Sequence, residues 1–312
     1  MNDFYPQKPV IEKVKVESNW GLTAFTIVLF IGTFLLVFSD QLEFVLLLIV
    51  VLFIHEMGHF AMMKRFNYEN VRMLFIPLMG AFVQGMKERY SQKQSFVVAA
   101  AGPFPGLILG SIGIWLADTY QIHWLMMLSF LFIFLNVINL LPLDPLDGGQ
   151  LFKLLVNKKR DLFLMIFALV SSLILIGVGF FIDSYILMAF GFFMGIRVRG
   201  IQRNYQLRKE LDEEEVNYVT TYDDLSNRDY AIIRRIIIEQ TPTLKKFIEL
   251  NNGIEEDIIA SHVNGVLLAP VEMDASKTFK WLVVLSWIGL MLLPFAVLFF
   301  GKLSLIWYFE GL

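Results

Sequence analysis

The sequence has 312 residues, of which 56% are hydrophobic and 18% are charged, and its formal net charge is -3. Because a soluble domain is about 45–50% apolar, this composition excludes an ordinary soluble enzyme. The absence of a basic region excludes a nucleic-acid-binding protein. The sequence also lacks cysteine, so disulfides, iron–sulfur clusters and thiolate zinc sites are excluded, and any metal must be bound by histidine or oxygen ligands.

The apolar residues are concentrated in long stretches that predict membrane spans. A helix needs about 20 apolar residues to cross a bilayer core, and seven stretches approach this length: 20–38, 44–62, 96–117, 124–142, 162–182, 185–196 and 281–300. We therefore predict an all-α polytopic membrane protein with about seven transmembrane helices, the sixth of them short and rich in glycine. The first 19 residues are polar and do not resemble a cleavable signal peptide, so we expect the first stretch to remain as an anchor.

Basic residues lie almost entirely on one side of these predicted spans. Four segments on that side contain 25 of the 26 lysines and arginines, whereas the loops 39–43, 118–123 and 183–184 contain none. The positive-inside rule places the richer side, including the N-terminus, in the cytoplasm. The pattern predicts a multi-pass protein of the cell membrane.

The sequence divides into four predicted regions. They are a cytoplasmic tail (1–19), a transmembrane core with six spans (20–200), an acidic cytosolic domain (201–278), and a last transmembrane helix with its tail (279–312). The cytosolic domain contains 9 basic and 15 acidic residues. Ser226 and Asn227 are typical caps at the start of a helix, and further helices are expected from Pro242 and Glu255. We predict a small helical domain, acting either as a solvated appendage or as a regulatory or substrate-docking module.

The second apolar stretch contains the HExxH pattern, formed by His55, Glu56 and His59. Residues four apart lie on one face of a helix, so both imidazoles can bind one zinc ion while Glu56 acts as a general base toward water. Ionisable groups inside a membrane span are costly and indicate a functional site. The alternative is that the two histidines and the glutamate satisfy one another structurally.

Catalytic zinc usually has three protein ligands, and a candidate segment for the third follows the fourth stretch. From Asn136 to Gly149 the sequence reads NVINLLPLDPLDGG. Its two prolines break the helix, and irregular backbone at membrane depth is tolerated where protein covers it or where it lines a wet cavity. The charge pattern places this segment and the HExxH stretch at the same side of the membrane, so they can meet.

Together, these motifs resemble the site-2 protease family of intramembrane zinc metalloproteases. That family combines HExxH with NxxPxxPLDG, matched here by Asn139, Pro142, Pro145, Leu146, Asp147 and Gly148. The resemblance covers about residues 44–156. It implies one Zn²⁺ per chain bound by His55, His59 and Asp147, with Glu56 as the general base and a transmembrane protein segment, cleaved within the lipid bilayer, as the substrate.

Residues near these two motifs are expected to have further roles. We expect Asn139 and Gly148 to bind substrate, with Gly148 and Gly149 forming a non-helical edge, and Asp144 to orient a ligand or to replace Asp147. Residues 71–86 are expected to form a β-hairpin that dips into the membrane interface and offers an edge to an unwound substrate, the alternative being an apolar connecting loop. The small-residue run from Ala101 to Gly106 resembles the family's next core span.

Two other functions fit parts of the sequence. A catalytically inactive adaptor of the same fold would bind transmembrane partners without cleaving them, but the complete HExxH set argues against it. A transporter would use the polar cluster as an ion site, and it would show broken helices in two related halves; the sequence shows one such break. His123 and His262 are expected to lie away from the metal.

Overall fold

A computed structural model describes residues 5–11, 20–37, 41–77, 80–156, 160–242, 244–246 and 256–301. These residues are mostly helical, and the chain divides into two compact units. One unit comprises residues 15–87, 91–155 and 273–312, and the other comprises 1–14, 88–90 and 156–272.

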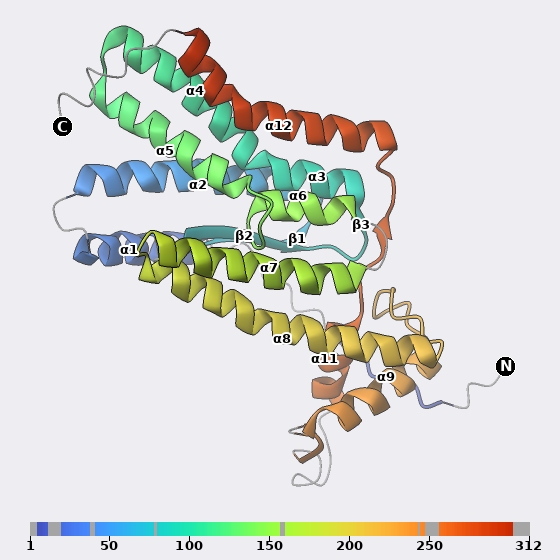
Figure 1. Cartoon of the computed structure of the whole chain (residues 1–312). Helices are drawn as coiled ribbons and strands as arrows, with labels where there is room; N and C mark the ends of the chain where they lie inside the picture. Colours follow the sequence, from blue (N-terminus) through green and yellow to red (C-terminus); the bar gives the residue numbers. More distant parts are fainter. Residues whose placement is uncertain are drawn as a thin grey trace. The chain divides into compact units, whose positions relative to one another are not determined.

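The first unit is built from apolar helices and contains all the residues of the predicted motif pair (Figure 1). Its helices are α1 (Trp20–Val37), α2 (Leu42–Arg65), α3 (Gln92–Ala101), α4 (Pro103–Tyr120), α5 (His123–Asn139), α6 (Asp147–Leu155) and α12 (Lys277–Phe300). Helices α4 and α5 pack along each other, and α12 packs on α4. The indole Nε1 of Trp287 on α12 donates to the Leu140 carbonyl at 2.8 Å, which fixes α12 near the segment that follows α5.

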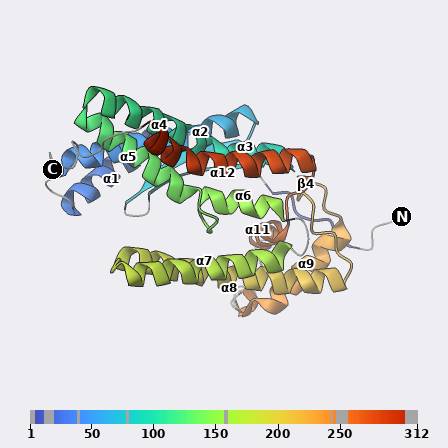
Figure 2. The same ribbon diagram turned by 45° about the horizontal axis from the view of Figure 1, so that its top comes forward.

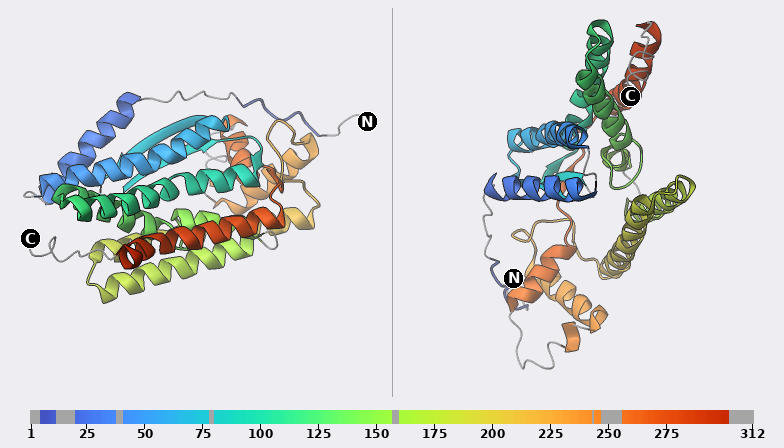
Figure 3. Two further views of the ribbon diagram at one scale, coloured as in Figure 1. Left: turned by 90° about the horizontal axis from the view of Figure 1, so that it is seen from above. Right: turned by 90° about the vertical axis from the view of Figure 1, so that its left-hand side faces the viewer.

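Two antiparallel strands, β1 (Glu69–Ile76) and β2 (Gly80–Met86), pack against α1 and α2 (Figure 3). Met73 pairs with Val83 in the regular part of the register, and an irregularity lies between Glu69 and Arg72. Phe30 and Phe75, both 1% exposed, pack with Met73 between α1 and the strands. The strands occupy the range in which a hairpin was expected, whereas its position in the membrane interface stays a prediction.

The second unit contains a long helical hairpin, α7 (Arg160–Phe181) and α8 (Tyr185–Glu213), followed by α9 (Asn227–Gln240) and α11 (Glu256–Val266) (Figure 2). The Ser172 hydroxyl donates to the Gly191 carbonyl at 2.7 Å within the hairpin. Isoleucines of α9, including the fully buried Ile233, pack with α11 and the end of α8. Two-residue strands β3 (Tyr90–Ser91) and β4 (Val271–Glu272) complete the described elements.

An N-terminal arm, residues 5–11, is fastened to the same unit through Lys8. Its ammonium donates to the carbonyls of Tyr222, Asp223 and Leu225 at 2.6 to 2.8 Å. Burial lowers the pKa of Lys8, while the charges of Asp223 and Asp224 oppose this shift. Ile11 adds an apolar contact to the α9–α11 core. The arm is therefore part of the helical unit, and most of the rest of the predicted tail lies outside the described residues.

Four described helices are long and apolar enough to cross a membrane: Leu42–Arg65, Gln92–Tyr120, Leu162–Phe181 and Lys277–Phe300. Apolar helices at Trp20–Leu36 and His123–Asn139 are shorter than this criterion. The predicted sixth span is the start of α8, which continues without a break to Glu213 because its second half is polar and helix-forming. A count of seven spans therefore stays a prediction, as do the membrane sidedness and the boundaries of the predicted domains.

Candidate metal centre

Helix α2 places His55, Glu56 and His59 in the interior of the first unit. All three side chains are buried, with 4%, 6% and 7% of their surface exposed. The helix is stabilised by its leucine, isoleucine and valine side chains, which pack against neighbouring apolar elements. Because an α-helix has 3.6 residues per turn, residues 55 and 59 place both imidazoles on one face. Gly58 lets α3 approach, since a Cβ there would lie 2.0 Å from the Ala101 carbonyl oxygen.

Asp147, the first residue of α6, meets the two histidines. Its Oδ2 lies 3.0 Å from Nε2 of His55 and 3.2 Å from Nε2 of His59, and the two Nε2 atoms are 3.2 Å apart. Zinc binds such atoms at about 2.0–2.2 Å with tetrahedral geometry, which separates neighbouring ligands by about 3.3 Å. The three donor atoms therefore have the spacing of a zinc ligand set.

Hydrogen bonds on the far side of each imidazole determine which nitrogen faces this centre. His55 Nδ1 lies 2.7 Å from Oδ1 of Asn136, whose amide Nδ2 donates to the Phe132 carbonyl at 2.7 Å. His59 Nδ1 lies 2.7 Å from the Val98 carbonyl. Because both partners are acceptors, each Nδ1 carries a hydrogen. With both rings neutral, each Nε2 presents a lone pair to the other and to a carboxylate oxygen, an arrangement that a bound cation would stabilise.

Two glycines provide the space for this arrangement. A Cβ on Gly102, between α3 and α4, would lie 2.4 Å from His59 Nε2 and 2.9 Å from His55 Nε2. A Cβ on Gly106 would lie 2.2 Å from the amide nitrogen of Asn136. Gly102 thus borders the metal-facing nitrogens directly, and Gly106 makes room for the amide that orients His55.

Glu56 is directed toward strand β2. Its carboxylate accepts a hydrogen bond from the backbone N–H of Val83, and it lies close enough to both histidines and Asp147 to interact with them electrostatically. The group is buried beside the three donor atoms and is not one of them. The action of Glu56 as a general base stays a prediction.

Asp144 has a different environment from the one expected for a metal ligand. It is 1% exposed and forms an ion pair with the ammonium of Lys153 at the other end of α6. The metal-binding group comprises His55, His59 and Asp147 without it. Gln92 also holds α6, donating from Nε2 to the Leu154 carbonyl at 2.6 Å. Asp144 therefore helps to fasten the helix that carries Asp147, and any direct effect on a metal ligand stays a prediction.

The expectation for the double glycine was wrong in one respect. Gly148 and Gly149 lie in the first turn of α6 and do not form a non-helical edge. They are needed because a Cβ on either residue would lie 2.1–2.2 Å from a backbone carbonyl of the preceding segment, at Leu140 or Leu143. Asn139 is the last residue of α5 and is half-buried. Substrate binding by Asn139 and Gly148 stays a prediction.

Sequence reasoning missed three features of the site: the Asn136 amide, the Val98 carbonyl and the role of Gly102. Asn136 is a polar residue in an otherwise apolar helix and is 0% exposed, which was the available signal. A backbone carbonyl has no signature in a sequence. His123 and His262 lie outside the candidate group formed by His55, His59 and Asp147 among the described residues.

Comparison with known proteins identifies the part of the chain that contains HExxH. Residues 43–122 match the model of peptidase family M50. This part of the chain is similar to peptidase family M50. The resemblance inferred from the sequence motifs is therefore confirmed for this region, which includes His55, Glu56 and His59 and ends before Asp147.

Two curated relatives are similar to part of this chain. Stage IV sporulation protein FB of Bacillus subtilis is 32% identical over 123 residues, which cover 39% of this chain and 43% of that protein. Zinc metalloprotease MJ0392 of Methanocaldococcus jannaschii is 27% identical over 119 residues, covering 36% and 34% respectively. This chain thus spans less than half the length of either relative.

A solved structure, the site-2 protease of Methanocaldococcus jannaschii, is also similar. The match has a TM-score of 0.44 and 22% identity, and it covers 56% of this chain and 87% of that one. At this level of similarity we draw no conclusion from it about the fold.

Proposed function

We propose that this protein is a zinc-dependent protease that cleaves transmembrane segments of other membrane proteins. The observation that carries the proposal is the convergence of three electron-pair donors, His55 Nε2, His59 Nε2 and Asp147 Oδ2, inside an apolar M50 domain. A structural cluster would pair donors with acceptors. Here the hydrogens of both imidazoles are directed away, so the centre is arranged for a cation.

Different residues of the chain orient the metal ligands and transfer the proton. Zinc, when bound, supplies Lewis-acid chemistry toward water and a peptide carbonyl. Asn136 and Val98 hold the two imidazoles in the tautomer that leaves Nε2 free. The Glu56 carboxylate takes a proton from the attacking water and later gives it to the leaving amine.

A helical substrate must unwind locally before its peptide bonds become accessible, and β2 is the strand edge that fits this requirement. The outer edge of β1 is covered by α1, since the Thr23 hydroxyl donates to the Met73 carbonyl at 2.8 Å and the Phe75 N–H donates to Thr26 at 3.3 Å. On β2, the Val83 N–H is directed to Glu56. Substrate backbone added along β2 would therefore lie beside the general base.

The first test is the zinc content of the full chain purified in detergent without chelators. We expect about one zinc per chain in the wild type, and loss of zinc in His59→Ala and Asp147→Ala. His123→Ala, which removes an imidazole outside the centre, is the matched control. A wild type that binds no zinc would favour the adaptor function. Zinc that survives Asp147→Ala would move the third ligand elsewhere, with Asp144 tested next.

The second test asks whether Glu56 is required for cleavage without being required for zinc. Membrane fractions from cells producing wild type or Glu56→Gln are compared by mass spectrometry of newly formed peptide ends. We expect ends within apolar spans in the wild type and not in Glu56→Gln, with zinc content equal in both. Identical ends in the two samples would contradict Glu56 as the base.

A further inference from the structure

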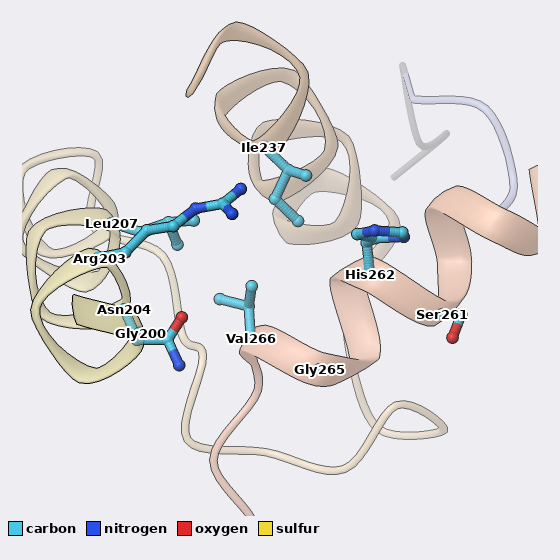
Figure 4. A pocket seen from close by; sticks show the side chains of 9 residues that line it. All are labelled: Gly200, Arg203, Asn204, Leu207, Ile237, Ser261, His262, Gly265 and Val266. Atoms are coloured by element: carbon cyan, nitrogen blue, oxygen red, sulfur yellow. The ribbon is translucent and has the colours of Figure 1, made fainter. Parts of the chain in front are cut away.

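The second unit contains a cavity of about 420 Å³ at the junction of α8, α9 and α11. Nine residues line it: Gly200, Arg203, Asn204, Leu207, Ile237, Ser261, His262, Gly265 and Val266. Figure 4 shows Arg203 and Asn204 reaching into it from α8, with Ile237, His262 and Val266 on the other sides. The cavity therefore combines polar donors with apolar walls.

The charge of this cavity is opposite to that of its surroundings. Residues 201–278 carry 15 acidic and 9 basic side chains, yet among the described residues the lining contains an arginine and no carboxylate. Within the described part of the chain, the Arg203 guanidinium donates to the Thr241 hydroxyl and forms no ion pair. His262 Nδ1 donates to the Ile258 carbonyl at 2.8 Å, so Nε2 can donate to a ligand only when the ring is protonated, and Arg203 is the permanent cation of the lining. This chemistry suits an oxyanion.

The register of α7 against α8 shows which part of α7 lies opposite the cavity. Gly191 lies between Ser172 and Ile176, and Gly179 lies between Ser184 and Met188. Extending this register toward the start of α7 places Arg203 about opposite Leu162. Leu162 is also the first residue of the candidate membrane span Leu162–Phe181, whose 20 residues match the thickness of a bilayer core.

The cavity thus lies at the level at which an apolar helix of the same unit begins, where lipid headgroups are found. Arg197 and Arg199, the first charged residues after the apolar start of α8, are exposed near this level. Basic residues and basic pockets at this depth are typical of contacts with anionic lipids. Leu207, Ile237 and Val266 supply the apolar walls that a free inorganic anion would not need.

We propose that this cavity is a binding site for the phosphate group of an anionic phospholipid, with Arg203 as its principal donor and Asn204 and His262 as further polar contacts. The site is separate from the metal centre in sequence and in chemistry, and it does not depend on proteolytic activity. It gives the helical unit a specific means of binding the membrane surface.

The test uses full-length protein in detergent and native mass spectrometry to count bound lipids. Phosphatidylglycerol is titrated against phosphatidylcholine, and inorganic phosphate is added in a separate arm as a competitor. We expect Arg203→Gln to weaken phosphatidylglycerol binding about tenfold or more. Lys209→Gln is the matched control, because it removes the same charge from an exposed position of the same helix outside the lining. Equal weakening by both variants would show general electrostatic attraction and overturn the proposal.

A second pair of variants guards against a folding defect caused by losing the Arg203–Thr241 contact. A Cβ on Gly265 meets nothing within 4 Å, so this position accepts a side chain. Gly265→Asp should abolish phosphatidylglycerol binding by repelling the phosphate, and the isosteric Gly265→Asn should retain it. Equal binding by this pair would overturn the proposal. If millimolar inorganic phosphate displaced bound phosphatidylglycerol as effectively as added phosphatidylglycerol does, the ligand of the cavity would not be a lipid.

Discussion

The metal centre lies among apolar helices and the Arg203 cavity lies among amphipathic ones, and their polar groups are held in opposite ways. At the centre, His55, His59 and Asn136 are buried, and each has a fixed partner behind it. At the cavity, Arg203 and His262 are exposed and have one anchoring contact each.

This difference shows where precision is needed. A buried polar atom without a partner costs about 1–3 kcal/mol, so the interior of the first unit allows few arrangements of its imidazoles and amide. Such rigidity suits metal binding, in which ligand positions must be correct to a few tenths of an ångström. The exposed cavity can adapt to a ligand because water satisfies its polar groups when no ligand is present.

The largest expected effect comes from filling the space beside the metal-facing nitrogens. Gly102→Ala would place a methyl group 2.4 Å from His59 Nε2, a distance that forces an imidazole to move. We expect zinc binding to be lost, as measured by metal content after purification. Gly289→Ala, in which the added Cβ meets nothing within 4 Å, is the control. Normal zinc content in Gly102→Ala would show that the centre is more adaptable than its geometry indicates.

The next effect concerns the helical unit and should leave the metal centre intact. Ile233 is 0% exposed in the α9–α11 core, so Ile233→Ala should reduce local stability by about 2–5 kcal/mol. Hydrogen exchange of α9 and α11 amides, followed by mass spectrometry on the full chain, would measure the change. Val219→Ala, at a half-exposed position, should have little effect. Loss of zinc in Ile233→Ala would show that the two regions are not independent.

The candidate metal ligands could be proposed from the sequence because their chemistry imposes a spacing. Two histidines four residues apart must share a helix face, and the aspartate that completes the set belongs to a recognisable segment. The cap at Ser226 was predictable for the same reason, since a local hydrogen bond requires a local pattern; Ser226 accepts from the Asp229 N–H at 3.0 Å.

Features that depend on tertiary approach could not be predicted in this way. The need for glycine at residue 102 arises from imidazoles more than 40 positions away, and the Val98 carbonyl has no side-chain signature at all. The error at Gly148 and Gly149 has a similar origin. Glycine pairs usually indicate irregular backbone, but here they permit a helix to start against the carbonyls of Leu140 and Leu143.

A smaller effect on zinc affinity is expected from changing Asn136, which orients His55 without binding the metal itself. Asn136→Leu removes the acceptor behind His55 while leaving all three donor atoms in place, and such changes typically weaken metal binding 10- to 100-fold. Competition with a zinc chelator of known affinity would measure it. Asn139→Leu alters the same helix one turn later, where no contact with His55 is formed, and should bind zinc as the wild type does. Unchanged affinity in Asn136→Leu would mean that the tautomer of His55 is fixed by other groups.

The smallest expected effect tests whether a surface hydrogen bond in the helical unit acts only locally. Ser226→Ala removes the cap of α9 and should cost about 1 kcal/mol, seen as faster hydrogen exchange in the first turn of that helix. Ser226→Asp keeps an acceptor at the same position and adds a charge favourable to a helix N-terminus, so exchange should stay slow. Because the fully buried Ile233 lies beyond that first turn, protection there should change much less than in Ile233→Ala. An equal loss of protection throughout α9 would show that the cap is required for the whole helix. It would also mean that a surface hydrogen bond of the helical unit is tightly coupled to the α9–α11 core.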